Sequence, residues 1–232
     1  MYKSKTWAAQ ETLALVWLLT AAAIAIIYPI WQGFNLPIFT LLFLMVPLVN
    51  LIINKDAKRI GMGRIKFVDL LKWAGINLGA LILVYAIFEP WSGAYAFLLG
   101  EATSPTTNDP TFALLQLIDG LGGWAAMFLF TALISIFAEE LFFRGWLQNL
   151  LRPKVGNVWA NVIQAAIFTL PQLIVAFIMP SPVMGLVYAL IYAFGAIGMI
   201  NGWVASRAGA IWPNLIAASL MNLILSIIIL GG

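Results

Sequence analysis

Long apolar runs separated by short polar stretches recur along the whole chain. Seven of these runs are close to or above the length of about 20 residues with which an α-helix crosses the hydrocarbon core of a membrane. The runs cover residues 12–30, 36–53, 71–88, 124–151, 158–179, 183–205 and 211–230. The pattern therefore predicts an all-α fold, a polytopic membrane helical bundle with about seven transmembrane helices.

The composition agrees with a protein that is embedded in lipid. Of the 232 residues, 63% are hydrophobic and 9% are charged, whereas charged residues make up about 25% of a typical soluble domain. No polar stretch is long enough for a separate soluble domain. We expect a single integral-membrane domain over residues 1–232, with N-terminal helices and an outer loop in 1–123 and a core in 124–222.

The residue types that are missing exclude several kinds of chemistry. The chain contains no Cys and no His, so it forms no disulfide and cannot build a zinc site from nitrogen or sulfur ligands. We expect no metal and no cofactor. The net charge of +3 does not come from one basic patch, so we expect no nucleic-acid partner, and the lipid bilayer is the expected surrounding.

The charged residues predict how the helices are oriented in the membrane. If seven helices alternate, one side holds Lys3, Lys5, Lys55, Lys58, Arg59, Arg64, Lys66, Lys72, Arg152, Lys154 and Arg207. The other side holds only acidic residues, namely Glu89, Glu101, Asp109 and Asp119. Because basic loops stay in the cytoplasm, we expect the N-terminus to be cytoplasmic and the C-terminus to lie on the outside. The expected location is an inner or plasma membrane.

Two adjacent carboxylates, Glu139 and Glu140, lie inside the apolar run 124–151. A charge in hydrocarbon loses much of its solvation unless it is paired, so ionisable residues inside spanning helices usually mark a site. With a helical rise of about 1.5 Å per residue, Glu139, Gln172 and Asn222 lie about 18, 21 and 16 Å from the same membrane face. We therefore predict that three helices bring these side chains to one interior site.

The two carboxylates are predicted to differ in role. Glu140 and Arg144 are four residues apart, with the acid N-terminal to the base, which favours an ion pair within one helix. We assign this pair a structural role. Glu139, one position round the helix, is then the less compensated carboxylate and a candidate general base.

Other polar and small residues have structural explanations. Gln172 and Asn222, each taken singly, are typical of amides that hold membrane helices together by hydrogen bonds. A further set lies near predicted helix ends or in loops, where solvation or capping explains it: Asn77, Gln116, Gln148, Asn161, Gln164 and Asn201. Gly195, Gly198 and Gly202 recur at spacings of three and four, which favours close packing of the sixth predicted helix against a neighbour.

The motif Glu139-Glu140-x-x-x-Arg144, followed by Gly-Trp-Leu-Gln at 145–148, resembles the first motif of the CPBP intramembrane peptidases. This family contains the type II CAAX prenyl endopeptidases and proteins of bacteriocin processing and self-immunity. Residues 198–209 are similar to the family's segment before its third motif. The resemblance implies a CPBP-like core.

The second and third motifs of the family match by position only. The second is a Phe followed four residues later by a His, and here Phe168 is followed by Gln172. The third is a His followed four residues later by an Asn, and here Ala218 precedes Asn222. Both motif histidines are thus replaced, within a resemblance that covers about residues 124–222.

The resemblance also implies roles for single residues. The first Glu of the family is taken to activate water, assisted by the second-motif His, while the His and Asn of the third motif stabilise the oxyanion. Carried over, Glu139 keeps the base role, but Gln172 cannot accept and return a proton near neutral pH as His does. The implied site, active or vestigial, consists of Glu139, Glu140, Arg144, Gln172 and Asn222.

Two functions follow from this combination. The first is a CPBP-like integral membrane protein that has lost peptidase activity and serves as a scaffold or subunit, binding a membrane-protein partner, a lipid or a pigment. The alternative is a divergent intramembrane glutamate-type endopeptidase in which Glu139 activates water and Gln172 and Asn222 donate to the oxyanion. A third interpretation, an ion or proton transporter with Glu139 as the carrier, requires a water path from both faces. The outer loop 91–123 is the expected place for a partner contact.

Overall fold

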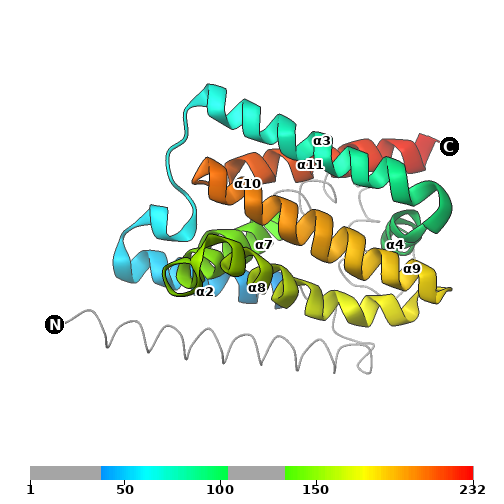
Figure 1. The fold of residues 1–232 in the computed structure, drawn as a ribbon, viewed down its shortest axis with the longest axis horizontal. Helices are drawn as coiled ribbons and strands as arrows, with labels where there is room; N and C mark the ends of the chain where they lie inside the picture. Colours follow the sequence, from blue (N-terminus) through cyan, green and yellow to red (C-terminus); the bar gives the residue numbers. More distant parts are fainter. Residues whose placement is uncertain (1–37, 104–133, 232) are drawn as a thin grey trace, which may run out of the picture.

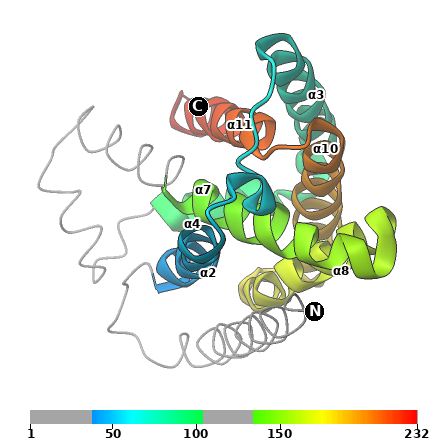
Figure 2. The ribbon, with the colours of Figure 1, turned by 90° about the vertical axis from the view of Figure 1, so that its left-hand side faces the viewer.

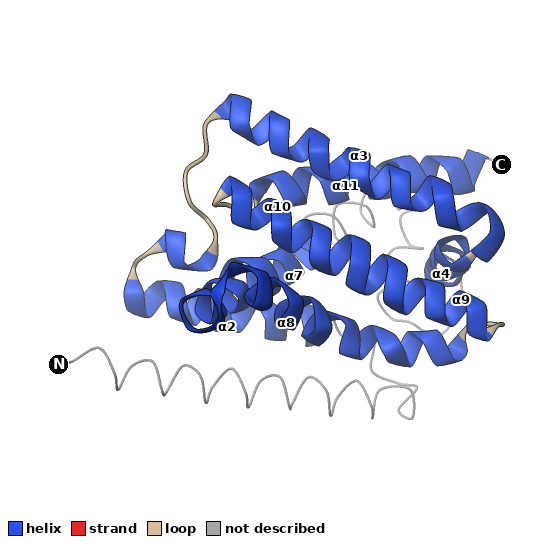
Figure 3. Cartoon of the chain, in the orientation of Figure 1, coloured by secondary structure: helices blue, strands red, loops and turns tan. Residues whose placement is uncertain are grey.

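The structure, a computed structural model, describes residues 38–103 and 134–231, and every regular element within them is a helix (Figures 1 and 3). The first part contains α2 (Ile38–Asn54), η2 (Ala57–Ile60), α3 (Phe67–Ser92) and α4 (Ala94–Thr103). The second contains α7 (Ile136–Glu139), η4 (Glu140–Leu147), α8 (Gln148–Ile178), α9 (Pro182–Leu186), η5 (Val187–Ile200), α10 (Asn201–Ala208) and α11 (Trp212–Gly231). The predicted all-α class is confirmed for these residues, while the predicted run 12–30 and most of the outer loop lie outside them.

Within the described residues, the predicted runs correspond to the observed helices with small shifts at their ends, and residues 124–133 of the fourth run lie outside the described part. The fourth and fifth runs are joined in α8, but Gly156 interrupts that helix with a non-helical conformation (φ 80°, ψ 170°). Because a positive φ costs little only in glycine, the chain can turn sharply there between the two predicted helices. The sixth run is longer than predicted, because α9, η5 and α10 form one continuous helix over Pro182–Ala208.

Two helices of the described part are long and apolar enough to cross a membrane. They are Phe67–Ser92, with a mean hydropathy of 1.8, and Pro182–Ala208, with 2.1. Shorter apolar helical segments cover Phe43–Asn54 and Trp212–Leu225. Membrane-helix character is therefore found, and the number of seven spans stays a prediction.

The basic loop residues of the described part are gathered at one end of the bundle, together with Asp56 and Asp69. The end of α2, η2, the start of α3 and the end of α10 lie together on the left of Figure 1, and they carry the basic loop residues. Glu89 lies near the opposite end of α3, where α4 begins. The side of the membrane that each end faces stays a prediction.

The π-helical segment η4 lies at the centre of the bundle (Figure 2). All eight of its residues are buried. The Phe43 ring of α2 lies 5.1 Å from the Phe142 ring and 5.0 Å from the Phe143 ring, and Phe143 is 5.1 Å from Phe168 of α8. These aromatic contacts fix the segment that carries the Glu-Glu-Arg motif between α2 and α8.

The loop after η2 closes the basic end of the bundle against η4. Gly61 adopts a left-handed conformation (φ 72°), and its carbonyl accepts a hydrogen bond of 2.9 Å from the Ile211 amide. The carbonyl of Gly63 accepts one of 3.1 Å from the Trp212 indole. Ile60 is fully buried, and a Cβ added to Gly145 would overlap the Ile60 carbonyl oxygen. The glycine that follows Arg144 is thus needed for close backbone approach.

Two of the three glycines in the predicted packing stripe contact a neighbouring helix. A Cβ at Gly198 would lie 2.8 Å from the Ala165 Cβ, and one at Gly202 would overlap the Asn161 side chain. Both neighbours belong to α8. The expected close packing is confirmed at Gly198 and Gly202, whereas Gly195 meets only a carbonyl of its own helix.

Replacement of Gly145 should destabilise the protein. Gly145→Ala forces the Ile60 backbone away from η4, and overpacking of this kind costs about 1–3 kcal/mol. Thermal unfolding in mild detergent measures the loss. Gly75→Ala in α3 is the matched control, because its Cβ would meet no atom within 4 Å. Equal unfolding temperatures for the two variants would contradict the packing argument.

Candidate functional site

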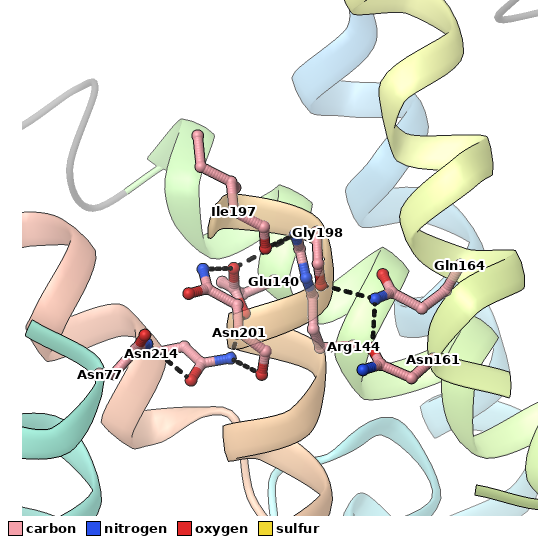
Figure 4. A network of polar contacts seen from close by, with 9 residues as sticks. All are labelled: Asn77, Glu140, Arg144, Asn161, Gln164, Ile197, Gly198, Asn201 and Asn214. Atoms are coloured by element: carbon pink, nitrogen blue, oxygen red, sulfur yellow. Dashed lines mark hydrogen bonds and ion pairs between the residues drawn. The ribbon is translucent and has the colours of Figure 1, made fainter. Parts of the chain in front are cut away.

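Glu140 and Arg144 form an ion pair in the interior of the bundle (Figure 4). The Glu140 Oε1 and Arg144 Nη1 atoms are 3.3 Å apart, and the two residues are only 2% and 1% exposed. Arg144 Nη2 also donates a hydrogen bond to the Ile197 carbonyl, and its guanidinium lies 4.5 Å from the centre of the Phe168 ring. The predicted pairing is confirmed.

Two asparagines complete the coordination of the Glu140 carboxylate. Asn201 Nδ2 donates to Oε1 at 3.0 Å, and Asn214 Nδ2 donates to Oε2 at 2.8 Å. Asn214 in turn accepts a hydrogen bond of 3.0 Å from Asn77 of α3. Each carboxylate oxygen therefore has a donor, and the network ties η4 to α3, α10 and α11.

A second set of amides ties α8 to the helix formed by η5 and α10. Gln164 Nε2 donates to the Gly198 carbonyl at 2.8 Å and to Asn161 Oδ1 at 2.9 Å. Asn161 donates to the Met199 carbonyl at 2.9 Å, and Gln148 to the Gly202 carbonyl at 3.0 Å. Figure 4 shows the Asn161–Gln164 branch beside Arg144.

These contacts overturn one sequence-based interpretation. Solvation or capping does not account for the following residues, which are 0–6% exposed and hydrogen-bonded inside the bundle: Asn77, Gln148, Asn161, Gln164 and Asn201. The reason is that the helices continue past the apolar windows, so that positions near a window's end lie within the packed structure. Gln116 lies outside the described residues.

A cavity of about 240 Å³ lies next to the ion pair. Its wall includes Glu139, Gln172 and Asn222, the three side chains predicted to meet at one depth. Phe168 and Ala218, from the positions of the second and third family motifs, also line it. The structure therefore brings the predicted residues of three helices around one space.

Tyrosine hydroxyls hold both cavity amides by their oxygen ends. Tyr188 Oη donates to Gln172 Oε1 at 2.9 Å, and Tyr95 Oη donates to Asn222 Oδ1 at 3.3 Å. No described residue accepts a hydrogen bond from the amide nitrogens or donates one to Glu139. The cavity consequently offers one carboxylate acceptor and two amide donors to a bound molecule.

Glu89 fixes the helix that brings Tyr95 to this cavity. Its carboxylate caps α4 by accepting from the amides of Tyr95 at 3.1 Å and Ala96 at 2.6 Å, and it accepts from Tyr192 Oη at 2.7 Å. Only 7% of Glu89 is exposed. Sequence reasoning placed Glu89 at the outer membrane face and missed the tyrosines, although Tyr188 and Tyr192 share a helix face by their spacing of four.

The comparisons with known proteins agree with the motif. The family model described as "Type II CAAX prenyl endopeptidase Rce1-like" matches residues 121–224. A search of curated proteins and a search of solved structures each found no match. This match confirms the resemblance to the Rce1-like family that the sequence shows, over residues 121–224 of the chain. This family is membrane-embedded, in agreement with the two apolar helices.

The two adjacent glutamates should differ sharply in their effect on stability. Glu140→Gln leaves Arg144 buried without its counter-charge, which costs about 3–5 kcal/mol in comparable pairs. Glu139→Gln is the matched control, because no described residue hydrogen-bonds to that carboxylate, and it should leave unfolding nearly unchanged. Denaturant unfolding in detergent compares the two, and a larger loss in Glu139→Gln would refute the assigned roles.

Proposed function

We propose that this protein binds the main chain of a partner membrane segment in the Glu139 cavity and has lost efficient peptidase activity. The observation that carries the proposal is the set of groups at the cavity: a carboxylate and two oriented amides, in a chain without histidine. The proposal makes the protein an Rce1-like scaffold or subunit of a membrane complex.

The groups of the cavity match those of a peptide unit. A peptide carbonyl can accept from Gln172 Nε2 or Asn222 Nδ2, and a peptide N–H can donate to Glu139. A hydrogen bond of this kind contributes about 0.5–1.5 kcal/mol net, and one to a charged group about 1.5–3 kcal/mol. Because unpaired peptide groups are costly in lipid, a partner helix that is unwound at one point would be held there selectively.

Efficient hydrolysis needs groups that this cavity does not supply. Amide cleavage requires one group to take a proton from water and return it to the leaving nitrogen. Glu139 is a carboxylate that can take part in this transfer, but an amide side chain at position 172 cannot assist it, and loss of an assisting proton-transfer group typically lowers the rate by about 10²–10⁴-fold. Ala218 offers no hydrogen bond, and loss of an oxyanion donor lowers the rate by about 10²–10³-fold.

A divergent endopeptidase is the second candidate function. The same tyrosine bonds that orient Gln172 and Asn222 leave their NH₂ groups as donors, and such donors suit an oxyanion as well as a ground-state carbonyl. In this candidate, Glu139 both takes the proton from the attacking water and returns it to the leaving amine.

Site-specific crosslinking separates the two candidates. A small diazirine amino acid at position 218 reports on the cavity, and the same group at position 227, where Ile227 is 58% exposed on the same helix, is the control. The proposal predicts an intact membrane segment crosslinked at 218 and not at 227. Truncated membrane peptides that accumulate only while Glu139 is intact would establish the endopeptidase instead.

The tyrosines should set the affinity of the cavity for its partner. Tyr188→Phe and Tyr95→Phe each release an amide that can then rotate, and the loss of one neutral hydrogen bond weakens binding about five-fold. The yield of the position-218 crosslink, measured against partner concentration, gives the change. Tyr85→Phe is the matched control, because Tyr85 lines the cavity but its hydroxyl bonds to no described residue. Equal affinities in all three variants would contradict the orienting role.

A further inference from the structure

A second hollow lies at the basic end of the bundle, away from the Glu139 cavity. It is a groove of about 760 Å³ between the start of the second part of α8 and the last turns of η5 and α10. Its wall includes Asn157, Val158, Ile200, Trp203, Ser206 and Arg207. None of the residues that line it is acidic.

The groove is charged and polar at its outer end and mostly apolar further in, where the one polar lining side chain, Asn161, already donates a hydrogen bond to the Met199 carbonyl. Arg207 and Ser206 lie on the last turn of α10, and Trp203 and Ile200 follow about one and two turns deeper, so that Ile200 is about 10 Å below Arg207. Val158 is 72% exposed on the facing helix. In a membrane this gradient places a charged rim at the headgroup level and an apolar floor beside the acyl chains.

The hydroxyl of Ser206 is prepared to act as a donor. Its oxygen already accepts hydrogen bonds from Gln148 Nε2 and Arg152 Nη2, both at 3.1 Å. With both acceptor positions used, the O–H proton remains for an acceptor in the groove.

Two arginines belong to this end of the groove: Arg152, which is bonded to the Ser206 hydroxyl, and Arg207, which lines the groove beside Ser206. Neither Arg152 nor Arg207 forms an ion pair with a carboxylate of the described residues. The Nε atom of Arg152 is buried and has no hydrogen-bond partner. A hydroxyl donor and two uncompensated cations together form a site for an oxyanion with several acceptor oxygens.

Aromatic and basic side chains extend the rim towards α3. The indole of Trp203 is 43% exposed and packs edge-on against Trp73, with ring centres 5.5 Å apart. The Lys72 ammonium lies 5.2 Å from the Trp73 ring. Indole rings and lysines in this arrangement are typical of the membrane interface.

We propose that this groove binds an anionic phospholipid. The phosphate receives hydrogen bonds from Ser206 and the Arg207 guanidinium, and the positive charge of Arg152, which donates to the Ser206 hydroxyl, adds electrostatic attraction. An acyl chain lies over Trp203 and Ile200. The charge complementarity and the polar-to-apolar gradient favour a lipid over free phosphate, because free phosphate has no acyl chain to contact the apolar residues of the groove. This site is independent of the Glu139 cavity and of the function proposed for it.

Native mass spectrometry of the full chain tests the proposal. The delipidated protein in mild detergent is offered equal amounts of phosphatidylglycerol and phosphatidylcholine. We expect preferential retention of phosphatidylglycerol, and a fall of that preference by about five-fold in Arg207→Gln, since one basic residue near a membrane surface contributes a factor of that size. Ser206→Ala should lower retention as well, and Arg207→Lys should keep most of the preference.

The controls separate the groove from general charge effects. Arg64→Gln removes an exposed cation at the same end of the bundle but outside the groove, and it should leave the preference unchanged. Inorganic phosphate at the same concentration should not displace the lipid. Equal retention of both lipids by the unaltered protein, an equal loss in Arg64→Gln, or displacement by inorganic phosphate would each overturn the proposal.

Discussion

The burial of a carboxylate and a guanidinium in the middle of an apolar bundle is the constraint on which the rest of this structure depends. Removing each charge from water costs several kcal/mol, and mutual attraction offsets that cost only if the remaining hydrogen-bonding positions are also satisfied. Asn201, Asn214 and the Ile197 carbonyl satisfy much of the Glu140–Arg144 pair. The pair therefore requires α10, α11 and η5 in fixed positions, and the fold of the core follows.

Close packing around this pair explains several small residues. Gly145 lets the Ile60 backbone approach η4, and Gly198 and Gly202 let α8 approach the helix on the other side. The amides of Asn161 and Gln164 then reach backbone carbonyls of that helix. Glycines and amides here serve one purpose, which is to bring helices close enough for polar groups to pair in an apolar surrounding.

Adjacent positions on a helix point about 100° apart, and this separates the roles of the two glutamates. Glu140 faces the ion pair and its asparagines, while Glu139 faces the cavity with Gln172 and Asn222. Because Glu140 holds the core together, the Glu139 carboxylate is available for binding or chemistry. A chain without histidine can therefore keep this core while the Glu139 cavity serves another purpose, and the proposed binding function is based on this separation.

Local sequence rules predicted the parts of this arrangement that depend on local spacing. The Glu140–Arg144 pair, the turn between the fourth and fifth runs and the close approach at Gly198 and Gly202 all follow from separations of a few residues. The partners Asn77, Asn201 and Asn214 could not be predicted in this way, because they meet Glu140 only through long-range packing. Tyr95 was likewise missed, since its position in the cavity depends on the Glu89 cap of α4.

A double-mutant cycle, measured by unfolding in detergent, tests most directly whether Glu140 has the structural role and Glu139 does not. The cycle combines Arg144→Met with Glu140→Gln and, separately, with Glu139→Gln, and it yields the coupling energy of each carboxylate with the guanidinium. The account predicts about 2–3 kcal/mol for Glu140 with Arg144, within the range of directly interacting residues, and less than half of that for Glu139. Equal coupling energies, or a larger one for Glu139, would contradict it.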